Sequence, residues 1–184
     1  MLKPRDLLEC GALFDLMKHP EVFPYVRQKA TTAEEYMFLT KQLIEAEAQH
    51  QAISRTILDE WLQPIGTITL YDIDERSGYL GTWIGQPYFG KGYNQKAKTA
   101  FFNELFTQTE IDTIFMRIRK ENIRSQKAAL KSPYVKPFED LTSPHYQKHK
   151  EHYHLYHITK DNYLLHQYQV ESFTQSSEQE LREA

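Results

Sequence analysis

Residues 83–94 hold the feature that most restricts the fold, a glycine-containing turn between a strand pattern and a helix pattern. The turn reads Trp-Ile-Gly-Gln-Pro-Tyr-Phe-Gly-Lys-Gly-Tyr-Asn. After it, apolar residues recur at helical spacing over residues 97–105, and residues 111–119 alternate as a strand does. A strand, a turn, a helix and a second strand predict a β-α-β crossover.

The remaining patterns predict two helices before this crossover and antiparallel strands around it. Asp6 is placed to cap a first helix that ends near His19, and Thr32 opens the capping box of a second helix that ends near Gln49. Further strands are predicted at residues 51–57, 62–71, 78–85, 134–138 and 152–158, with a short helix at 122–130. We therefore predict one α/β domain over residues 1–167, with a mixed, mostly antiparallel sheet flanked by helices.

The two ends of the chain carry separate predictions. Residues 1–3 leave almost no room for a strand before the first helix, so the sheet is predicted to begin with residues 51–57. An exposed edge there would invite pairing with a second copy, as a homodimer, or with the C-terminal tail. The segment 168–184 is rich in Ser, Gln and Glu and is predicted to be a polar, loosely held tail.

Charge and apolar content exclude several classes of protein. The chain has 22 basic and 25 acidic residues, which argues against a nucleic-acid partner. No apolar run reaches the roughly 20 residues that span a bilayer, and the N-terminus lacks a signal sequence. We expect a cytoplasmic protein with no membrane partner. Cys10 is the only cysteine, and its apolar neighbours predict a buried thiol.

The pair Gly90 and Gly92 immediately precedes the predicted helix. Glycine lets backbone amides approach an anion closely, and a helix N-terminus adds unpaired N–H groups and a positive dipole end. The arrangement suits a pyrophosphate. A plain loop is the more common reading of such a turn when it is considered alone.

Five histidines near the C-terminus form the second cluster of interest, and they are His145, His149, His152, His154 and His157. His152 and His154 would share one face of a strand, which is compatible with metal ligation. No carboxylate or cysteine spacing completes a familiar zinc pattern, so we expect an aromatic-rich surface strand and no metal.

Three stretches in order resemble the GNAT superfamily of N-acetyltransferases, in particular its RimJ/RimL-like branch. Residues 87–97 resemble the acetyl-CoA pyrophosphate loop, with an aromatic residue before Gly-x-Gly-Tyr. Residues 119–125 resemble the Asn-x-x-Ser element that follows the fifth strand, and residues 157–163 resemble the closing strand and its turn. The resemblance covers roughly residues 2–165.

The resemblance implies a single-domain GNAT fold with splayed central strands and acetyl-CoA as co-substrate. Its pantetheine arm would contact the backbone of residues 83–85, and its reactive end would lie near Asn122. The implied cofactor-binding residues are Trp83, Ile84, Gly85, Phe89, Gly90, Lys91, Gly92, Tyr93, Asn94 and Asn122.

Several positions depart from the family pattern. Ala129 stands where many members have the tyrosine that protonates the leaving thiolate, so Ser125 becomes the candidate acid. Tyr79 stands where this branch often has a glutamate base. Residues 132–134 replace the usual Gly-Phe, which predicts a remodelled acceptor side.

Two functions follow from the resemblance. The first is an enzyme that transfers an acetyl group from acetyl-CoA directly to a primary amine of a peptide N-terminus or a small, polyamine-like molecule. Tyr134, His152 and His154 are its candidate substrate-binding residues, because aromatic faces and neutral imidazoles can hold a cationic amine. The alternative is a catalytically weak CoA-binding protein, which the missing tyrosine and glutamate favour.

Overall fold

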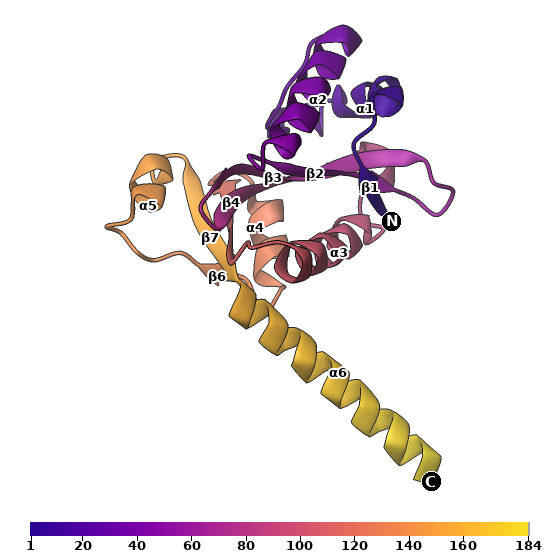
Figure 1. The fold of residues 1–184 in the computed structure, drawn as a ribbon, viewed down its shortest axis with the longest axis vertical. Helices are drawn as coiled ribbons and strands as arrows, with labels where there is room; N and C mark the ends of the chain where they lie inside the picture. Colours follow the sequence, from indigo (N-terminus) through magenta and orange to yellow (C-terminus); the bar gives the residue numbers. More distant parts are fainter. Residues whose placement is uncertain (184) are drawn as a thin grey trace. The chain divides into compact units, whose positions relative to one another are not determined.

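The computed structural model describes the backbone of residues 1–183 and the side chains of residues 1–172. The chain forms two compact units, residues 1–111 and residues 112–184, which are described separately below. Both units contain helices and strands, and the two alternate along the second unit (Figure 1).

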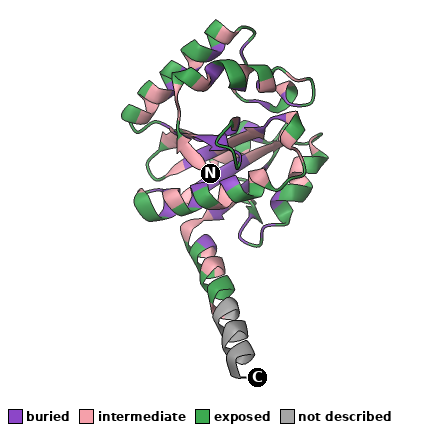
Figure 2. Cartoon of the chain, turned by 90° about the vertical axis from the view of Figure 1, so that its right-hand side faces the viewer, coloured by how far each residue is buried: buried purple, intermediate pink, exposed green. Residues whose placement is uncertain are grey.

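Four antiparallel strands form the sheet of the first unit, in the order β1-β2-β3-β4. Helices α1 and α2 lie on one side of these strands and α3 on the other (Figures 1 and 2). The strands are β1 (Leu2–Pro4), β2 (Ile53–Leu58), β3 (Pro64–Asp74) and β4 (Ser77–Ile84). The helices are α1 (Cys10–Met17), α2 (Ala33–Ala48) and α3 (Tyr93–Gln108), with 3₁₀ turns at Leu7–Glu9, Phe23–Tyr25 and Gln86–Tyr88.

Strand β1 contradicts the prediction that the sheet begins with β2. Leu2 pairs with Ile57 and Pro4 with Arg55, so three residues are enough to add an antiparallel edge strand. A proline is tolerated there because an edge strand needs hydrogen bonds on one side only. Since β1 covers β2, the motive for pairing a second copy along β2 is removed. The homodimer stays a prediction.

The capping predictions are confirmed with one change at the first helix. Asp6 accepts a hydrogen bond from the N–H of Leu8, but it caps the 3₁₀ turn that leads into α1. The hydroxyl of Thr32 accepts from the N–H of Glu35 at 3.1 Å, and the Glu35 carboxylate accepts in return from Thr31. The start of α2 is therefore fixed by side chains on both sides of the cap.

Cys10 belongs to the apolar cluster that packs beneath α1 and α2. Its side chain is fully buried, as predicted, and its thiol lies 3.9 Å from the carbonyl oxygen of Asp6. The buried members of this cluster are Cys10, Leu13, Met17, Val22, Val26, Ala30 and Tyr36.

The second unit places β7 between β5 and β6, and both pairings are antiparallel. Its elements are β5 (Thr113–Arg119), α4 (Ile123–Leu130), β6 (Lys136–Pro137), α5 (Pro144–His149), β7 (Tyr153–Thr159) and α6 (Lys160–Glu183). Strand β6 is shorter than the predicted 134–138. Its second residue is Pro137, which lacks the N–H group that continues a ladder.

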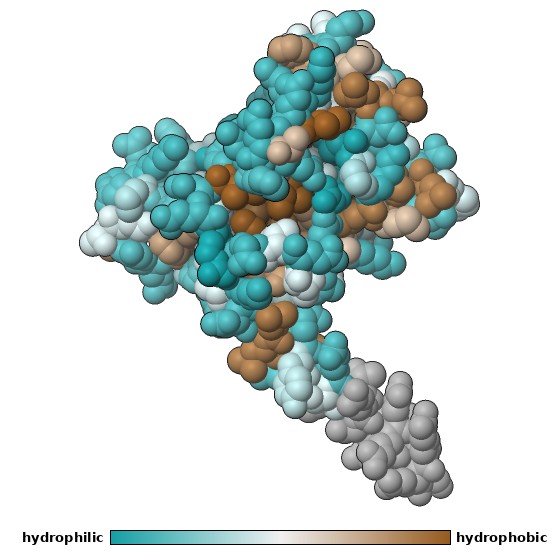
Figure 3. All heavy atoms as spheres, viewed as in Figure 1, coloured by the Kyte–Doolittle hydropathy of each residue, from teal (hydrophilic) through white to brown (hydrophobic). Residues whose placement is uncertain are grey.

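Helix α6 continues through residue 183, so most of segment 168–184 lies on a helix, and residue 184 lies outside the described residues. The domain boundary after residue 167 stays a prediction. In the described part of α6, Leu164 and Leu165 are exposed, and Figure 3 shows this apolar patch on the helix.

Aromatic rings pack β7 against its neighbours. Phe138 meets Phe115 edge-on at 5.2 Å and His157 at 5.4 Å, measured between ring centroids. The Nδ1 atom of His157 is buried without a hydrogen-bond partner. Desolvation by burial lowers the pKa of His157 below its ordinary value of 6.5.

This lowered pKa predicts a loss of stability in acid. The folded state favours neutral His157, so the unfolded chain binds the extra proton as the pH falls below about 6.5. His157→Gln should reduce the fall in melting temperature between pH 7 and pH 5, measured by thermal unfolding. His154→Gln is the matched control, because His154 is exposed on the same strand. Equal pH dependence in wild type and His157→Gln would contradict the prediction.

Candidate functional site

The turn between β4 and α3 has a backbone that only glycine adopts easily. Gly90 has φ +74° and Gly92 has φ +82°, both in the left-handed region. A Cβ built at either position would have no atom within 4 Å, so open space lies beside both glycines. The glycines are therefore required by backbone conformation, and the space beside them is free for a ligand.

Helix α3 begins with its first amides uncapped. Gly92 is the N-cap residue, and having no side chain it gives no side-chain capping hydrogen bond to the first turn. The left-handed Gly92 starts the helix, so the helix follows immediately after the predicted double glycine. Tyr93 and Asn94 lie in the first turn, where backbone N–H groups have no partner within the helix. These groups and the helix dipole form a site that favours an anion.

Aromatic contacts hold this turn in place. The rings of Tyr88 and Tyr93 meet edge-on at 5.9 Å, and the ammonium of Lys91 lies 5.5 Å from the centre of the Tyr88 ring. The Tyr93 hydroxyl donates to the carboxylate of Glu60, and this bond raises the pKa of Tyr93 to about 12. Phe89 packs against the cluster beneath α1. The loop is thus tied to two other parts of its unit.

The end of β4 supplies the predicted pantetheine contacts. Trp83 pairs with Thr67 across the ladder, and Ile84 is buried. The N–H of Gly85 donates to the carbonyl of Ile65 at 2.8 Å, so it is already used within the sheet. A Cβ at Gly85 would lie 2.9 Å from the side chain of Leu16. Gly85 therefore serves close packing in this structure.

In the second unit, Asn122 and Ser125 are brought together at the start of α4. The side-chain oxygen of Asn122 accepts the N–H of Ser125 at 3.1 Å, which makes Asn122 the N-cap. Ser125 is half-buried, and the structure shows no hydrogen bond of its hydroxyl to the described residues. Ala129, one turn later, is buried. The Asn-x-x-Ser spacing therefore has a structural role as a cap and leaves the Ser125 hydroxyl available.

The three predicted substrate-binding residues have different surroundings. Tyr134 is buried, and its ring meets Tyr163 edge-on at 5.0 Å. His152 precedes β7, and both His152 and His154 are exposed. Tyr134 thus packs in the interior of its unit, while the two histidines are open to solvent.

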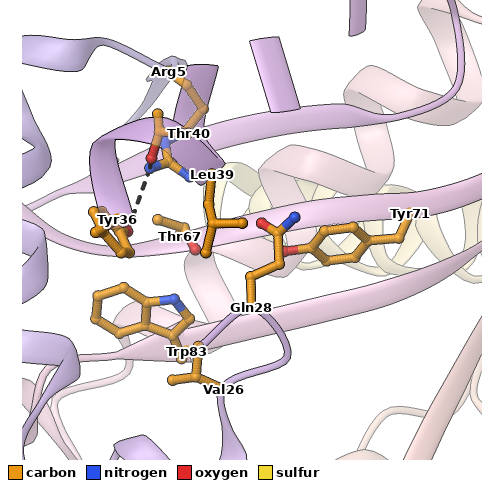
Figure 4. Close-up of a pocket in the computed structure, with 9 residues that line it drawn as sticks. All are labelled: Arg5, Val26, Gln28, Tyr36, Leu39, Thr40, Thr67, Tyr71 and Trp83. Atoms are coloured by element: carbon orange, nitrogen blue, oxygen red, sulfur yellow. Dashed lines mark hydrogen bonds between the residues drawn. The ribbon is translucent and has the colours of Figure 1, made fainter. Parts of the chain in front are cut away.

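Sequence reasoning missed a polar hollow in the first unit, beneath α2 (Figure 4). It is lined by Arg5, Val26, Gln28, Tyr36, Leu39, Thr40, Thr67, Tyr71 and Trp83. The lining comes from five separate segments of the chain, so no local motif marks it. The one signal available was the alternation of threonines along β3.

Among the residues whose side chains are described, no three His, Cys, Asp or Glu groups come together as a metal site would require. Within the same part of the chain, no helix combines the length and apolar character needed to cross a bilayer.

A family model described as an acetyltransferase (GNAT) domain matches residues 1–133, well over half of the chain. The chain belongs to the GNAT acetyltransferase family. The prediction of an N-acetyltransferase that depends on acetyl-CoA is confirmed by this membership. The glycine turn of this GNAT chain fits the predicted co-substrate, since its left-handed glycines and uncapped amides leave space for a pyrophosphate.

Solved structures share the fold at low sequence identity. FdhC, a nucleotide-linked sugar GNAT, matches with a TM-score of 0.74 and 16% identity over 92% of this chain and 91% of its own. RimJ of Mycobacterium smegmatis, in complex with CoA-disulfide, matches with a TM-score of 0.71 and 16% identity over 86% and 80%.

A spermidine N-acetyltransferase SpeG chimera from Vibrio cholerae and hSSAT matches with a TM-score of 0.70 and 15% identity over 89% and 97%. The search of curated proteins found no significant match. These likenesses confirm the predicted α/β GNAT fold class.

Proposed function

We propose that the chain transfers an acetyl group from acetyl-CoA directly to a primary amine, on a peptide N-terminus or a small molecule. The observation that carries the proposal is the pair of left-handed glycines before the uncapped start of α3. The names of structural neighbours support an amine acceptor, since they include a spermidine N-acetyltransferase and the L7/L12 alpha-N-protein acetyltransferase RimL.

The residues of the glycine turn would hold the pyrophosphate. Backbone amides from Gly90 to Asn94 would donate to its oxygens, and Lys91 would add a positive charge at the surface. Trp83, Ile84 and Gly85 would line the pantetheine arm, with Phe89 fixing the turn against the core. Acetyl-CoA, when bound, supplies a thioester whose acetyl carbon accepts the amine.

Ser125 would supply the proton that the leaving group needs. In the transfer, the amine nitrogen bonds to the acetyl carbon, the carbon–sulfur bond breaks, and the sulfur takes a proton while the nitrogen loses one. The hydroxyl of Ser125 is half-buried at the start of α4, and Asn122 holds that turn in place. Tyr134, His152 and His154 stay the proposed acceptor residues, with a neutral imidazole able to take the proton from the amine.

The second candidate is a protein that binds CoA without useful catalysis. The observation that favours it is the burial of Tyr79 and Ala129 at the positions of the expected base and acid. Release of free CoA from acetyl-CoA, measured against a panel of amines, separates the two. Amine-dependent release supports the enzyme, and CoA binding without release supports the alternative.

We predict that Ser125→Ala lowers the maximal rate by about 100-fold or more with little change in substrate binding, as loss of a general acid would. Ser125→Thr keeps a hydroxyl and should retain much of the rate. Steady-state kinetics with a single-turnover measurement checks the effect on chemistry. An unchanged chemical rate in Ser125→Ala would remove this residue from the mechanism.

A further inference from the structure

Hydroxyl groups line the face of the sheet beneath α2. In the ladder, Thr67 lies opposite Thr56 on one side and opposite Trp83 on the other, so these side chains share one face. Two residues along each strand, on the same face, the hydroxyls of Ser54 and Thr69 share a hydrogen bond of 2.7 Å. All four hydroxyl residues are buried. A buried layer of this kind is polar where most sheet–helix contacts are apolar.

Arg5 points its guanidinium into this layer from the segment after β1 (Figure 4). Its Nη2 atom donates to the hydroxyl of Tyr36 at 3.3 Å and to that of Thr40 at 3.2 Å. Its Nε atom is buried and has no hydrogen-bond partner. The Thr56 hydroxyl is buried and unpartnered as well. The layer thus contains two buried polar atoms that have no hydrogen-bond partner.

No carboxylate among the described side chains lies within ion-pair distance of Arg5. The two nearest acidic residues in sequence are already engaged by Lys3, whose ammonium lies 2.8 Å from Glu9 and 3.6 Å from Asp6. Leaving a cation without a counter-charge in a partly buried site is unfavourable. The guanidinium of Arg5 is therefore available to bind a group other than an internal carboxylate.

The hollow beside Arg5 opens to solvent. It measures about 280 Å³ together with its open mouth, and its enclosed part is close to the size of one water molecule. Such a space suits one oxygen atom of a larger anion whose remainder lies in the mouth. Tyr36, Leu39 and Thr40 supply the wall from α2, because positions i, i+3 and i+4 share a helix face.

We infer that this hollow binds an anionic group, a carboxylate or a phosphate, carried by the acetyl acceptor. The inference rests on the proposed function for the link to acetyl transfer. Trp83 provides that link, because it lines the hollow and also belongs to the predicted pantetheine contact. The oxygen of the anion accepts hydrogen bonds from Arg5 and from the surrounding hydroxyls, an arrangement in which charge-assisted bonds are strong.

The sign of the charge narrows the acceptor class. Arg5 would repel a second cationic group at this position, so a polyamine is disfavoured as acceptor. An amine that also bears a carboxylate or a phosphate is favoured, such as a peptide with an acidic group near its N-terminus. The hollow thus selects among the amines that the proposed function leaves open.

The first experiment measures anion binding without any acetyl transfer. Inorganic phosphate and acetate are titrated separately into wild type and Arg5→Gln by calorimetry. We expect Arg5→Gln to weaken binding at least tenfold and Arg5→Lys to keep part of it. Phosphate binding that is lost in Gly92→Val instead belongs to the glycine turn. For each anion, the binding that is lost in Arg5→Gln is the binding that depends on Arg5. The anion with the higher affinity in this Arg5-dependent binding identifies the chemistry of the ligand.

Arg27 provides the matched control. It lies over the ring of Tyr71, which lines the hollow, but Asp72 already neutralises it at 2.5 Å. Arg27→Gln should leave anion binding unchanged. Thr40→Asp is a second variant that does not depend on removing Arg5. It places a carboxylate beside the guanidinium, so it should block anion binding and raise the melting temperature.

The second experiment compares acetyl transfer to 4-aminobutanoate and to its amide. A lower KM for the acid in wild type, lost in Arg5→Gln and kept in Arg27→Gln, supports the inference. Phosphate and acetate binding that is absent in wild type, or unchanged in both Arg5→Gln and Thr40→Asp, overturns it whether or not CoA is released. If no amine causes CoA release, the proposed function is overturned. The binding experiment on Arg5 still tests the anion site, because it does not depend on acetyl transfer.

Discussion

Gly92→Val is expected to abolish detectable acetyl-CoA binding. A left-handed conformation costs an L-residue about 1–2 kcal/mol, and a β-branched side chain is a genuine outlier there. Gly92 has φ +82° and starts α3, so relieving the strain would rotate the amides that the pyrophosphate needs. The valine side chain would also occupy the open space beside the turn. We expect affinity to fall by at least about 100-fold, measured by calorimetry with CoA and acetyl-CoA.

Two further variants separate this effect from general destabilisation. Gly92→Ala adds strain without the branched side chain and should lose less affinity. Gly11→Ala is the matched control, because Gly11 lies within α1 with ordinary helical φ and no atom within 4 Å of an added Cβ. It should bind the cofactor as wild type does. Equal affinity of wild type and a folded Gly92→Val would refute the assignment of the turn.

Arg55→Met is expected to cause the largest loss of stability. The guanidinium of Arg55 connects two helices, since it bonds to Glu47 of α2 at 2.6 Å and to Glu104 of α3 at 2.9 Å. The side chains of Arg55, Glu47 and Glu104 are 15%, 30% and 22% exposed, respectively. Removing the cation therefore leaves two carboxylates without a counter-charge in sites that are largely shielded from water. Breaking such a partly buried network costs about 3–5 kcal/mol. Denaturant unfolding measures the change.

The control for this variant is an exposed ion pair. Arg76 lies 3.7 Å from Glu110, and their side chains are 56% and 93% exposed. Arg76→Met should therefore change stability by less than about 1 kcal/mol. Replacing Arg55, Glu47 and Glu104 together by apolar residues should recover much of the loss, because no charge is then stranded. A loss below about 1 kcal/mol in Arg55→Met would contradict the prediction.

Sequence patterns predicted correctly those parts of the fold that depend on residues close together in the chain. The capping box at Thr32 and the double glycine before α3 each depend on residues a few positions apart, and both were placed correctly. Strand β1 was missed because three residues carry no periodicity, and its existence depends on pairing with β2.

The residues of the candidate site also fall into those that sequence spacing identifies and those that only the packing brings together. Gly90 and Gly92 are identified by spacing, and the structure supplies the physical reason in their positive φ values. The hollow at Arg5 could not be identified, because its lining residues are distant in the sequence. From the sequence alone, an arginine is expected to be a charged residue on the surface. Only the packing of α2 over the hydroxyl-bearing strands turns Arg5 into a candidate ligand-binding group.

The burial of Cys10 makes the protein convenient to assay. Thiol reagents react with exposed thiolates, and the only cysteine of this chain is fully buried at the start of α1. In the folded protein, colour from a disulfide reagent should therefore report released CoA with little background from the enzyme. The same thiol becomes reactive when the first unit opens. One reagent can thus follow turnover of the native protein and, without substrate, the rate at which a destabilised variant unfolds.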